Sequence, residues 1–151
     1  MVDVSAKAIT VRQALAAGDV VMAAATGEMI RAGGASKGDV LGVATLAAIQ
    51  STKLTAQLIP LCHAIPVEGV AVEFQWLDET PSNDSNRLRC LVRVHTSAKT
   101  GVEMEAITAA AIACVTVYDM VKSVDRTISI GPVQLLEKSG GKSGDFRREP
   151  E

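Results

Sequence analysis

A carboxylate and an amine stand three positions apart near the end of a strongly apolar segment. Asp119 and Lys122 lie on one side of that segment if it is helical, with about 60° between them. A carboxylate at this spacing favours the charged ammonium and raises its pKa. The pair could orient Lys122 for proton transfer, or it could be an ordinary surface ion pair that contributes little stability.

Further lysines stand beside small residues in segments that are predicted as loops. Lys37 lies in SKGD, Lys99 in AKTG and Lys142 in GKSG, while Lys138 opens KSGG. Backbone donors and ammonium groups can converge on phosphate oxygens in such segments. We therefore expect a site for an anion, and the alternative for any one of these lysines is a solvated loop residue.

Two glutamates stand at the start of the same apolar segment. Thr100 and Glu103 have the spacing of a capping box, which gives Glu103 a structural role. Glu105 is then the better candidate for chemistry, with an exposed helical carboxylate as the alternative. On a helix, Glu105 lies about 21 Å from Asp119. One small pocket cannot use both, so a ligand that contacts both would need a site shared between subunits.

Cys62 and His63 lie between two prolines, Pro60 and Pro66, which disfavour a helix there. Histidine titrates near neutral pH and suits proton transfer or ligand binding, although a lone histidine is more often structural, as we expect for His95. A nucleophilic role for Cys62 would need a base and an oxyanion site that the sequence does not reveal. The three cysteines are far apart, so neither a disulfide framework nor a zinc site is expected.

Composition restricts the classes of partner. The 151 residues are 48% hydrophobic, which fits one compact domain, and the chain has only two Phe, one Trp and one Tyr. Stacking surfaces for nucleic acid are therefore scarce, and the net charge of -2 provides no field that would attract it or a membrane surface. No apolar stretch of membrane-spanning length and no secretory signal is recognised, which predicts a cytoplasmic protein without membrane or nucleic-acid partners.

The periodicity of the chain predicts helices that alternate with paired strands. A capping-box pattern at Thr10 and Gln13 predicts a short helix over 11–17, and further helices are expected over 26–30 and over 40–58, the latter capped by Asp39. A helix of about five or six turns should follow Thr100 and end near YDMVKSV. Short loops that contain glycine should separate these helices from their neighbours.

Strands are expected where apolar residues alternate with polar ones. These segments are residues 19–24, 70–76, 87–96 and 126–137, the last interrupted by Gly131-Pro132 as an edge or a bulge, with a polar turn over 77–86. Strand pairs mixed with long helices predict an α+β class, with helices packed on one face of an antiparallel sheet. No internal repeat is visible.

Seven short segments, read in order from Met1 to Phe146, resemble the cyclic pyranopterin monophosphate synthase family, MoaC. They are MVDVSAK, KGDV, LIPLCH, KTGVEMEA, YDM with VKSV, IGPV and EKSGGKSGDF. The resemblance implies a ferredoxin-like fold and a homohexamer, a trimer of dimers, with active sites at subunit interfaces. It also implies a reaction of molybdenum cofactor biosynthesis, in which cyclic dihydroguanosine triphosphate becomes cyclic pyranopterin monophosphate and pyrophosphate is released.

The same resemblance assigns roles to residues of this chain. It implies that Asp119, Lys37 and Lys122 are catalytic. The substrate-binding residues that it implies are Leu61, Cys62, His63, Glu103, Met104, Glu105, Lys138 and Lys142. Residues 1–137 would form a single synthase domain and residues 138–151 a flexible Gly/Ser/Lys tail. No metal site and no redox cofactor are expected, and Mg²⁺ could bind through the substrate phosphates.

Two other readings keep the fold but change the function. One is a receptor for a nucleotide or polyphosphate that does not turn it over, and the other is an oligomeric scaffold. The scaffold predicts that guanine triphosphates do not protect the protein against heat, whereas the enzyme and the receptor both predict that they do.

Overall fold

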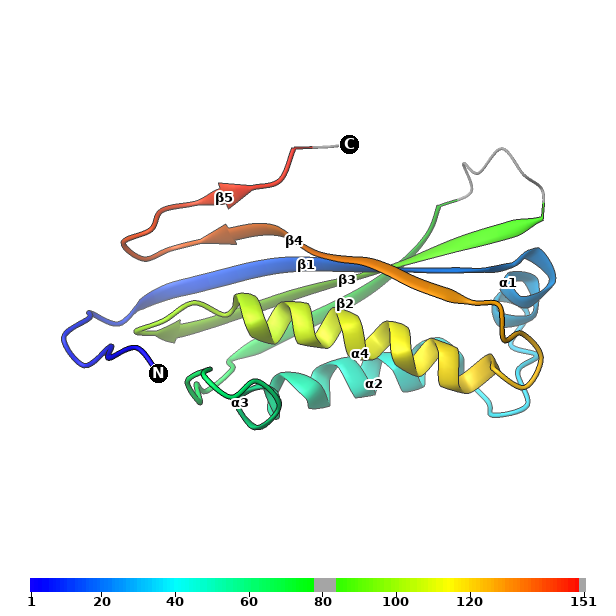
Figure 1. Ribbon diagram of the computed structural model, residues 1–151, viewed down its shortest axis with the longest axis horizontal. Coiled ribbons are helices and arrows are strands. Elements are labelled where there is room, and N and C mark those ends of the chain that lie inside the picture. The colour runs from blue at the N-terminus through cyan, green and yellow to red at the C-terminus, as the bar shows by residue number, and fades with distance from the viewer. Residues whose placement is uncertain (78–83, 150–151) are drawn as a thin grey trace.

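A computed structural model describes residues 1–77 and 84–149. Five strands form one antiparallel sheet in the order β2-β3-β1-β4-β5 (Figure 1). The strands are β1 (Thr10–Ala23), β2 (Gly69–Leu77), β3 (Ser85–Ala98), β4 (Ser129–Ser139) and β5 (Phe146–Arg147). The helices are α1 (Ala24–Arg31), α2 (Val40–Thr52), α3 (Thr55–Leu58) and α4 (Glu103–Val121).

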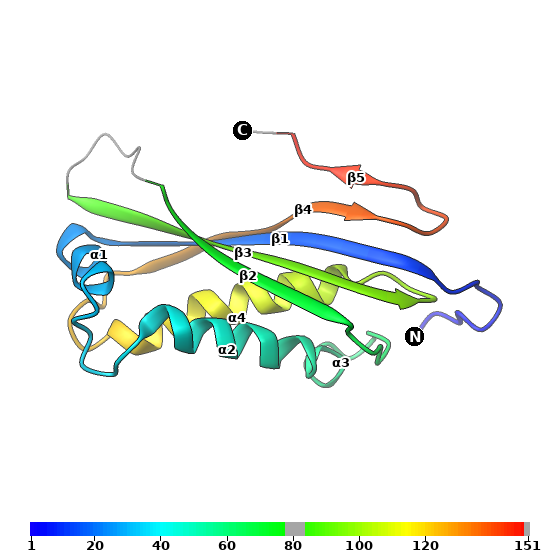
Figure 2. The same ribbon diagram turned by 180° about the vertical axis from the view of Figure 1, so that it is seen from behind.

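The long helices α2 and α4 lie side by side on the same face of the sheet (Figures 1 and 2). Helices connect β1 to β2 and β3 to β4, and the first four strands lie in the order β2-β3-β1-β4. This is ferredoxin-like connectivity, which confirms the α+β class with helices on one face of an antiparallel sheet. The core between the layers includes Ala14, Ala16, Val20, Met22, Leu88, Cys90, Val92 and Val94 from the sheet.

The helix expected over 11–17 is wrong, because this segment is the first half of β1. The strand pairs with β3 along its whole length, from Thr10 opposite Ala98 to Ala23 opposite Ser85. Its small residues are required by packing: a Cβ added to Gly18 would lie 2.7 Å from Cys114 Sγ on α4. The alanines of β1 therefore allow the helix to approach the sheet, and this tertiary requirement overrides their helix propensity.

The second helical region agrees with the prediction at its start and differs at its end. Asp39 accepts a hydrogen bond from the amide of Gly42 at 2.9 Å, as expected of an N-cap. The continuous helix expected over 40–58 instead ends at Thr52, and α3 follows as a separate turn. The hydroxyl groups of Ser51 and Thr55 donate to backbone carbonyls here, a pattern that competes with regular helix.

The strands β2 and β3 confirm the alternation that predicted them. The even-numbered residues of β3 from Leu88 to Ala98 are buried, while Arg93, His95 and Ser97 are exposed. Of the polar turn expected over 77–86, residues 78–83 lie outside the described residues. On the helix-free face, buried Asp19 accepts hydrogen bonds from Arg89, at 2.7 and 2.9 Å.

The helix α4 confirms the expected long core helix, with two corrections. Its N-cap is Val102 and has no side-chain capping bond, so the capping box at Thr100 and Glu103 is wrong. By length and composition it could also cross a membrane, contrary to the expectation that no stretch would qualify. Its residues pack against α2, β1, β3 and β4, however, which makes it the core helix of this domain.

The final strands show a bulge and a hairpin. The register between β1 and β4 shifts between Gly18 and Val20, opposite Gly131-Pro132, and this confirms the expected interruption. Lys138 lies within β4, opposite Phe146 of β5, so the segment after residue 137 begins as a β-hairpin. The division into a synthase domain over 1–137 and a flexible tail over 138–151 stays a prediction.

Candidate active site

The three predicted catalytic residues meet at the C-terminal end of α4. Lys122 Nζ lies 2.6 Å from Asp119 Oδ1, which confirms the predicted pair. Lys37, from the loop between α1 and α2, lies 2.7 Å from Asp119 Oδ2. We call these residues the lysine–aspartate cluster. Its side chains are about half exposed, at 43% for Lys37 and 51% for the other two.

The end of the helix itself helps to hold Lys37. Its ammonium also donates to the backbone carbonyl of Asp119 at 2.8 Å. Carbonyls in the last turn of a helix lack intrahelical partners and carry partial negative charge. Lys37 is therefore held by the main chain of α4 as well as by a carboxylate.

The cluster has a defined charge state at neutral pH. Hydrogen bonds from Lys122 and Lys37 lower the pKa of Asp119 to about 2. In return, the hydrogen bond and charge of Asp119 raise the pKa of Lys122. Two ammonium groups and one carboxylate leave one net positive charge. The cluster is thus poised to donate a proton or to bind an anion, and a lysine can act as a base only after its contact with Asp119 weakens.

The predicted substrate-binding residues lie mainly at the opposite end of α4. The N-terminal segment, α3 and the turn between β4 and β5 lie at this end of the molecule (Figure 1). Lys138 Nζ lies 3.3 Å from Glu103 Oε1 and donates to Ser143 Oγ at 3.1 Å. Glu103 therefore pairs with a lysine of β4, in place of its expected capping role. Lys142 is exposed in the turn between β4 and β5.

Glu105 is buried, contrary to the exposed carboxylate that we kept as its alternative. Its side chain is 4% exposed, and this burial raises its pKa. Burial, followed by the charge of Glu105, also raises the pKa of the Cys62 thiol. The charge of Glu105 therefore acts on the Cys62 thiol.

The remaining predicted residues lie in the loop after α3 and in the first turn of α4. His63 Nε2 lies 2.8 Å from the backbone oxygen of Val2, so the histidine contacts the N-terminal segment. Leu61 is 71% exposed and Met104 is half-buried. The loop or strand start predicted for Cys62 and His63 is confirmed as a loop. Together with Glu103, Glu105, Lys138 and Lys142, these residues form what we call the polar end of the site.

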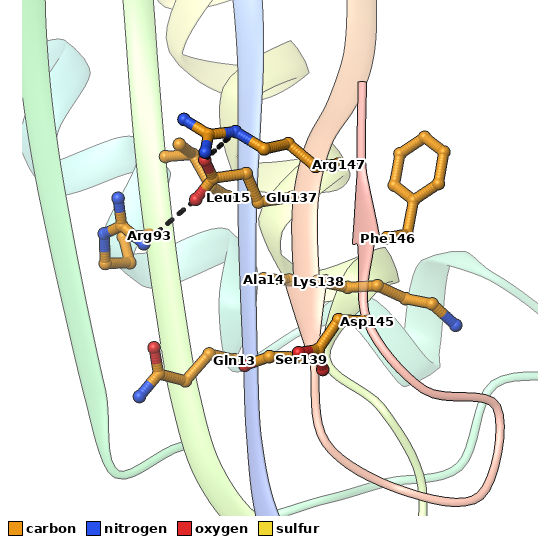
Figure 3. A pocket seen from close by; sticks show the side chains of 10 residues that line it. All are labelled: Gln13, Ala14, Leu15, Arg93, Glu137, Lys138, Ser139, Asp145, Phe146 and Arg147. Atoms are coloured by element: carbon orange, nitrogen blue, oxygen red, sulfur yellow. Dashed lines mark ion pairs between the residues drawn. The ribbon is translucent and has the colours of Figure 1, made fainter. Parts of the chain in front are cut away.

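A hollow on the helix-free face of the sheet contains only one predicted residue, Lys138 (Figure 3). Of its other charged residues, Glu137 lies 3.8 Å from Arg93 and 3.3 Å from Arg147, and Asp145 accepts a hydrogen bond from the amide of Gly140. In Figure 3 the Lys138 side chain points away from these pairs. This hollow is therefore not the meeting point of the predicted site residues.

No cluster suited to a resident metal stands out. Within residues 1–77 and 84–149, no group of three or more His, Cys, Asp or Glu side chains could hold a metal ion. The three cysteines, Cys62, Cys90 and Cys114, are all free. The expectation of Mg²⁺ bound through substrate phosphates stays a prediction.

Sequence reasoning missed Arg12 and the role of Lys99. Arg12 is 9% exposed and donates to the carbonyls of Gly140 and Lys99, while Lys99 Nζ donates to Ser5 O at 2.7 Å. The helix predicted over 11–17 concealed Arg12. Had the segment been predicted as a strand, Arg12 would have been expected near the start of that strand, close to the N-terminal arm.

The fold and the site together define an α+β protein of ferredoxin-like connectivity, with candidate site residues at both ends of one core helix. The sequence matches the MoaC family over residues 1–141. It is 56% identical over 153 residues to cyclic pyranopterin monophosphate synthase of Rhodopirellula baltica, covering 99% of this chain and 87% of that protein. It is 49% identical over 149 residues to the enzyme of the same name from Chloroflexus aggregans, with coverages of 99% and 87%. The chain belongs to the MoaC family.

Replacing Asp119 by Asn should lower the pKa of Lys122, because the carboxylate is what raises it. Competitive acetylation followed by mass spectrometry, from about pH 8 to pH 11, spans the ordinary range of a lysine. We expect Lys122 to be acetylated at lower pH in Asp119→Asn than in the wild type. Labelling of Lys53, at the end of α2, should be equal in both proteins. Identical curves for Lys122 would show that Asp119 does not control its protonation.

Replacing Glu105 by Gln should lower the pKa of Cys62, because one of the two causes that raise it is removed. The rate of alkylation by iodoacetamide measures this thiolate. The other two thiols are buried with pKa values of about 12, so they should not react in the folded protein. We expect faster alkylation in Glu105→Gln and an unchanged rate in the control Glu103→Gln. Equal rates in all three proteins would show that the charge of Glu105 does not influence the Cys62 thiol.

Proposed function

We propose that this protein is a cyclic pyranopterin monophosphate synthase, a lyase that converts cyclic dihydroguanosine triphosphate to cyclic pyranopterin monophosphate and releases pyrophosphate. The reaction belongs to molybdenum cofactor biosynthesis. The observation that carries the proposal is the lysine–aspartate cluster, in a chain whose relatives bear that enzyme's name. In this cluster one ammonium group contacts each oxygen of the Asp119 carboxylate.

Opening and reclosing a ring requires groups that donate and accept protons in turn. Lys122 and Lys37 are the donors and acceptors in our proposal, and Asp119 orients both through contacts of 2.6 and 2.7 Å. Binding of an anionic substrate would compete with Asp119 for these ammonium groups. Such competition weakens the contact that raises the pKa of Lys122, and so makes its neutral form more accessible as a base.

The polar end supplies groups that suit the rest of the substrate. We assign the triphosphate to Lys138 and Lys142 with His63, since ammonium and imidazole groups bind phosphate oxygens. Leu61, Cys62 and Met104 would contact the ring system. Glu105 and Glu103 are the hydrogen-bond acceptors for its N–H groups. This scheme uses no redox cofactor, and Mg²⁺ would enter bound to the phosphates.

We further propose that each active site is formed by two subunits of a homohexamer built as a trimer of dimers in the cytoplasm. Along α4, Glu105 and Asp119 are about 21 Å apart, too far for one small ligand. Large apolar side chains on the outer face of the helix layer support contact with another copy of the chain. They include Val43 at 39%, Leu46 at 68% and Val115 at 51% exposure.

The purified protein should convert cyclic dihydroguanosine triphosphate to a pyranopterin, detected after oxidation to its fluorescent form, and to pyrophosphate. Lys122→Ala should retain the hexamer and lose turnover by about a hundredfold or more, the usual contribution of a positioned acid or base. Lys53→Ala, which removes an exposed lysine outside the site, is the control. Normal product formation by Lys122→Ala would sink the acid–base role, and absence of product from the wild type would sink the proposed enzyme.

A shared site should show complementation between two inactive chains. Co-expression of Lys122→Ala with His63→Ala, each with its own affinity tag, gives mixed dimers in which one of two sites has both residues intact. We expect the mixture to recover up to about a quarter of the wild-type activity, from random pairing into two-fold dimers. Either variant alone should stay inactive. If each site lies within one chain, the mixture will recover nothing.

A further inference from the structure

The polar end is assembled from segments that are far apart in the sequence. The residues that define it come from the loop after α3, from α4, from β4 and from the turn between β4 and β5 that carries Lys142. They adjoin the N-terminal arm with Ser5 and Lys7, which His63 contacts through Val2, and the loop before α4 with Lys99. All lie at one end of the sheet (Figures 1 and 2). Their relative placement must be fixed by contacts that join them, because no single helix or strand carries them all.

Arg12, near the start of β1, contacts the turn and the loop before α4 directly, and it is linked to the N-terminal arm through Lys99. Its guanidinium donates to Gly140 O at 3.5 Å and to Lys99 O at 3.4 Å. Lys99 in turn donates to Ser5 O at 2.7 Å, which continues the connection into the N-terminal arm. Arg12 also lines a hollow together with Lys7 and Lys142.

The turn after β4 approaches Arg12 so closely that it requires glycine. Gly140 and Gly141 have φ values of 90° and 81°, a region that side chains rarely adopt. A Cβ on Gly140 would collide with Val11 O, and a Cβ on Gly141 would collide with the Arg12 guanidinium. Gly144 has a similar φ of 68°, but a Cβ there would meet nothing within 4 Å. The two glycines next to Arg12 therefore serve a contact as well as a turn.

Arg12 is buried without a counter-ion among the described residues, which suggests that its hydrogen bonds to the main chain matter for the arrangement of these segments. The side chain is 9% exposed, its Nε has no hydrogen-bond partner, and no carboxylate in the described part of the chain pairs with it. Burying a guanidinium without a counter-ion costs free energy, which its hydrogen bonds must offset. The contacts that it does make are all to the main chain of the turn and the loop.

We propose that Arg12 is a positioning residue, which fixes the turn at 140–143 against the loop at Lys99 so that Lys142 faces the N-terminal arm. This inference rests on the proposed function, since that proposal assigns Lys142 to the substrate phosphates. Arg12 acts through the main chain of its neighbours. Its loss should weaken substrate binding more than it slows the chemistry, because the lysine–aspartate cluster lies at the other end of α4.

Two substitutions disturb this contact from opposite sides. Arg12→Met removes the guanidinium and keeps a long apolar side chain, whereas Gly141→Ala keeps the guanidinium and pushes the turn away from it. Each should raise the KM for cyclic dihydroguanosine triphosphate about tenfold, the effect of losing a charged hydrogen bond, and leave kcat within about twofold. Gly144→Ala, with similar backbone strain and no collision, and Arg147→Met, on exposed β5, should both behave as the wild type.

Hydrogen exchange provides a readout that does not depend on turnover. The amide of Gly140 donates to Asp145 Oδ1 and the amide of Gly144 donates to Gly141 O, each at 3.2 Å. Both amides should exchange faster in Arg12→Met, while those of α2 should be unchanged. If exchange in the turn is unaffected, the positioning role is wrong.

The kinetic outcomes separate positioning from direct contact with the substrate. A raised KM in Arg12→Met with a normal KM in Gly141→Ala would show that the arginine binds the substrate itself, and would overturn the proposal. Normal kinetics in both variants would overturn it as well. If the wild-type protein forms no product, the proposed function fails, yet the exchange experiment still decides the role of Arg12.

Discussion

The close approach of α4 to β1 is the constraint on which the arrangement of this protein depends. At Gly18 the strand has no side chain, and a Cβ there would lie 3.1 Å from the backbone oxygen of Ala110. The facing side of the helix is equally small, with Ala106, Ala109, Ala110 and Ala113 fully buried. Small residues on both elements let a helix of 19 residues lie against the central strand. The positions of its two ends, and so of both groups of polar residues, follow from this contact.

The charges at the ends of α4 suit the helix as well as the proposed chemistry. Glu103 and Glu105 occupy the first turn, where the partial positive charge of the helix favours carboxylates. At the other end, Lys37 donates to a carbonyl of the last turn and Lys122 is the C-cap residue, so both place a positive charge where the helix favours it. Asp119 is the exception, because a carboxylate in the last turn is repelled by the helix. The two lysines offset that repulsion and hold the pKa of Asp119 at about 2.

What the sequence could predict was local. The alternation of β2 and β3 was readable because one face of each strand is buried, and the pairing of Asp119 with Lys122 was readable because they are three positions apart on one helix. Lys37 meets Asp119 across 82 positions, and no spacing rule predicts such a contact; only the family resemblance joined them. The capping boxes predicted at Thr10 and Thr100 failed for the same reason. Thr10 pairs with Ala98 of β3 as a strand residue, and Glu103 pairs with Lys138 of β4.

The two ends of the site therefore differ in how they are built. The lysine–aspartate cluster needs one helix end and one loop, and its contacts are short, at 2.6 to 2.8 Å. The polar end needs the N-terminal arm, two loops and a hairpin turn, joined through hydrogen bonds that range from 2.7 Å between Lys99 and Ser5 to 3.5 Å between Arg12 and Gly140. Charge-assisted contacts within one small cluster hold side chains in place before a ligand arrives. A region made of several separate segments depends instead on contacts between those segments. The proposed division of roles, with proton transfer at the lysine–aspartate cluster and binding of the substrate phosphates at the polar end, agrees with this difference in construction.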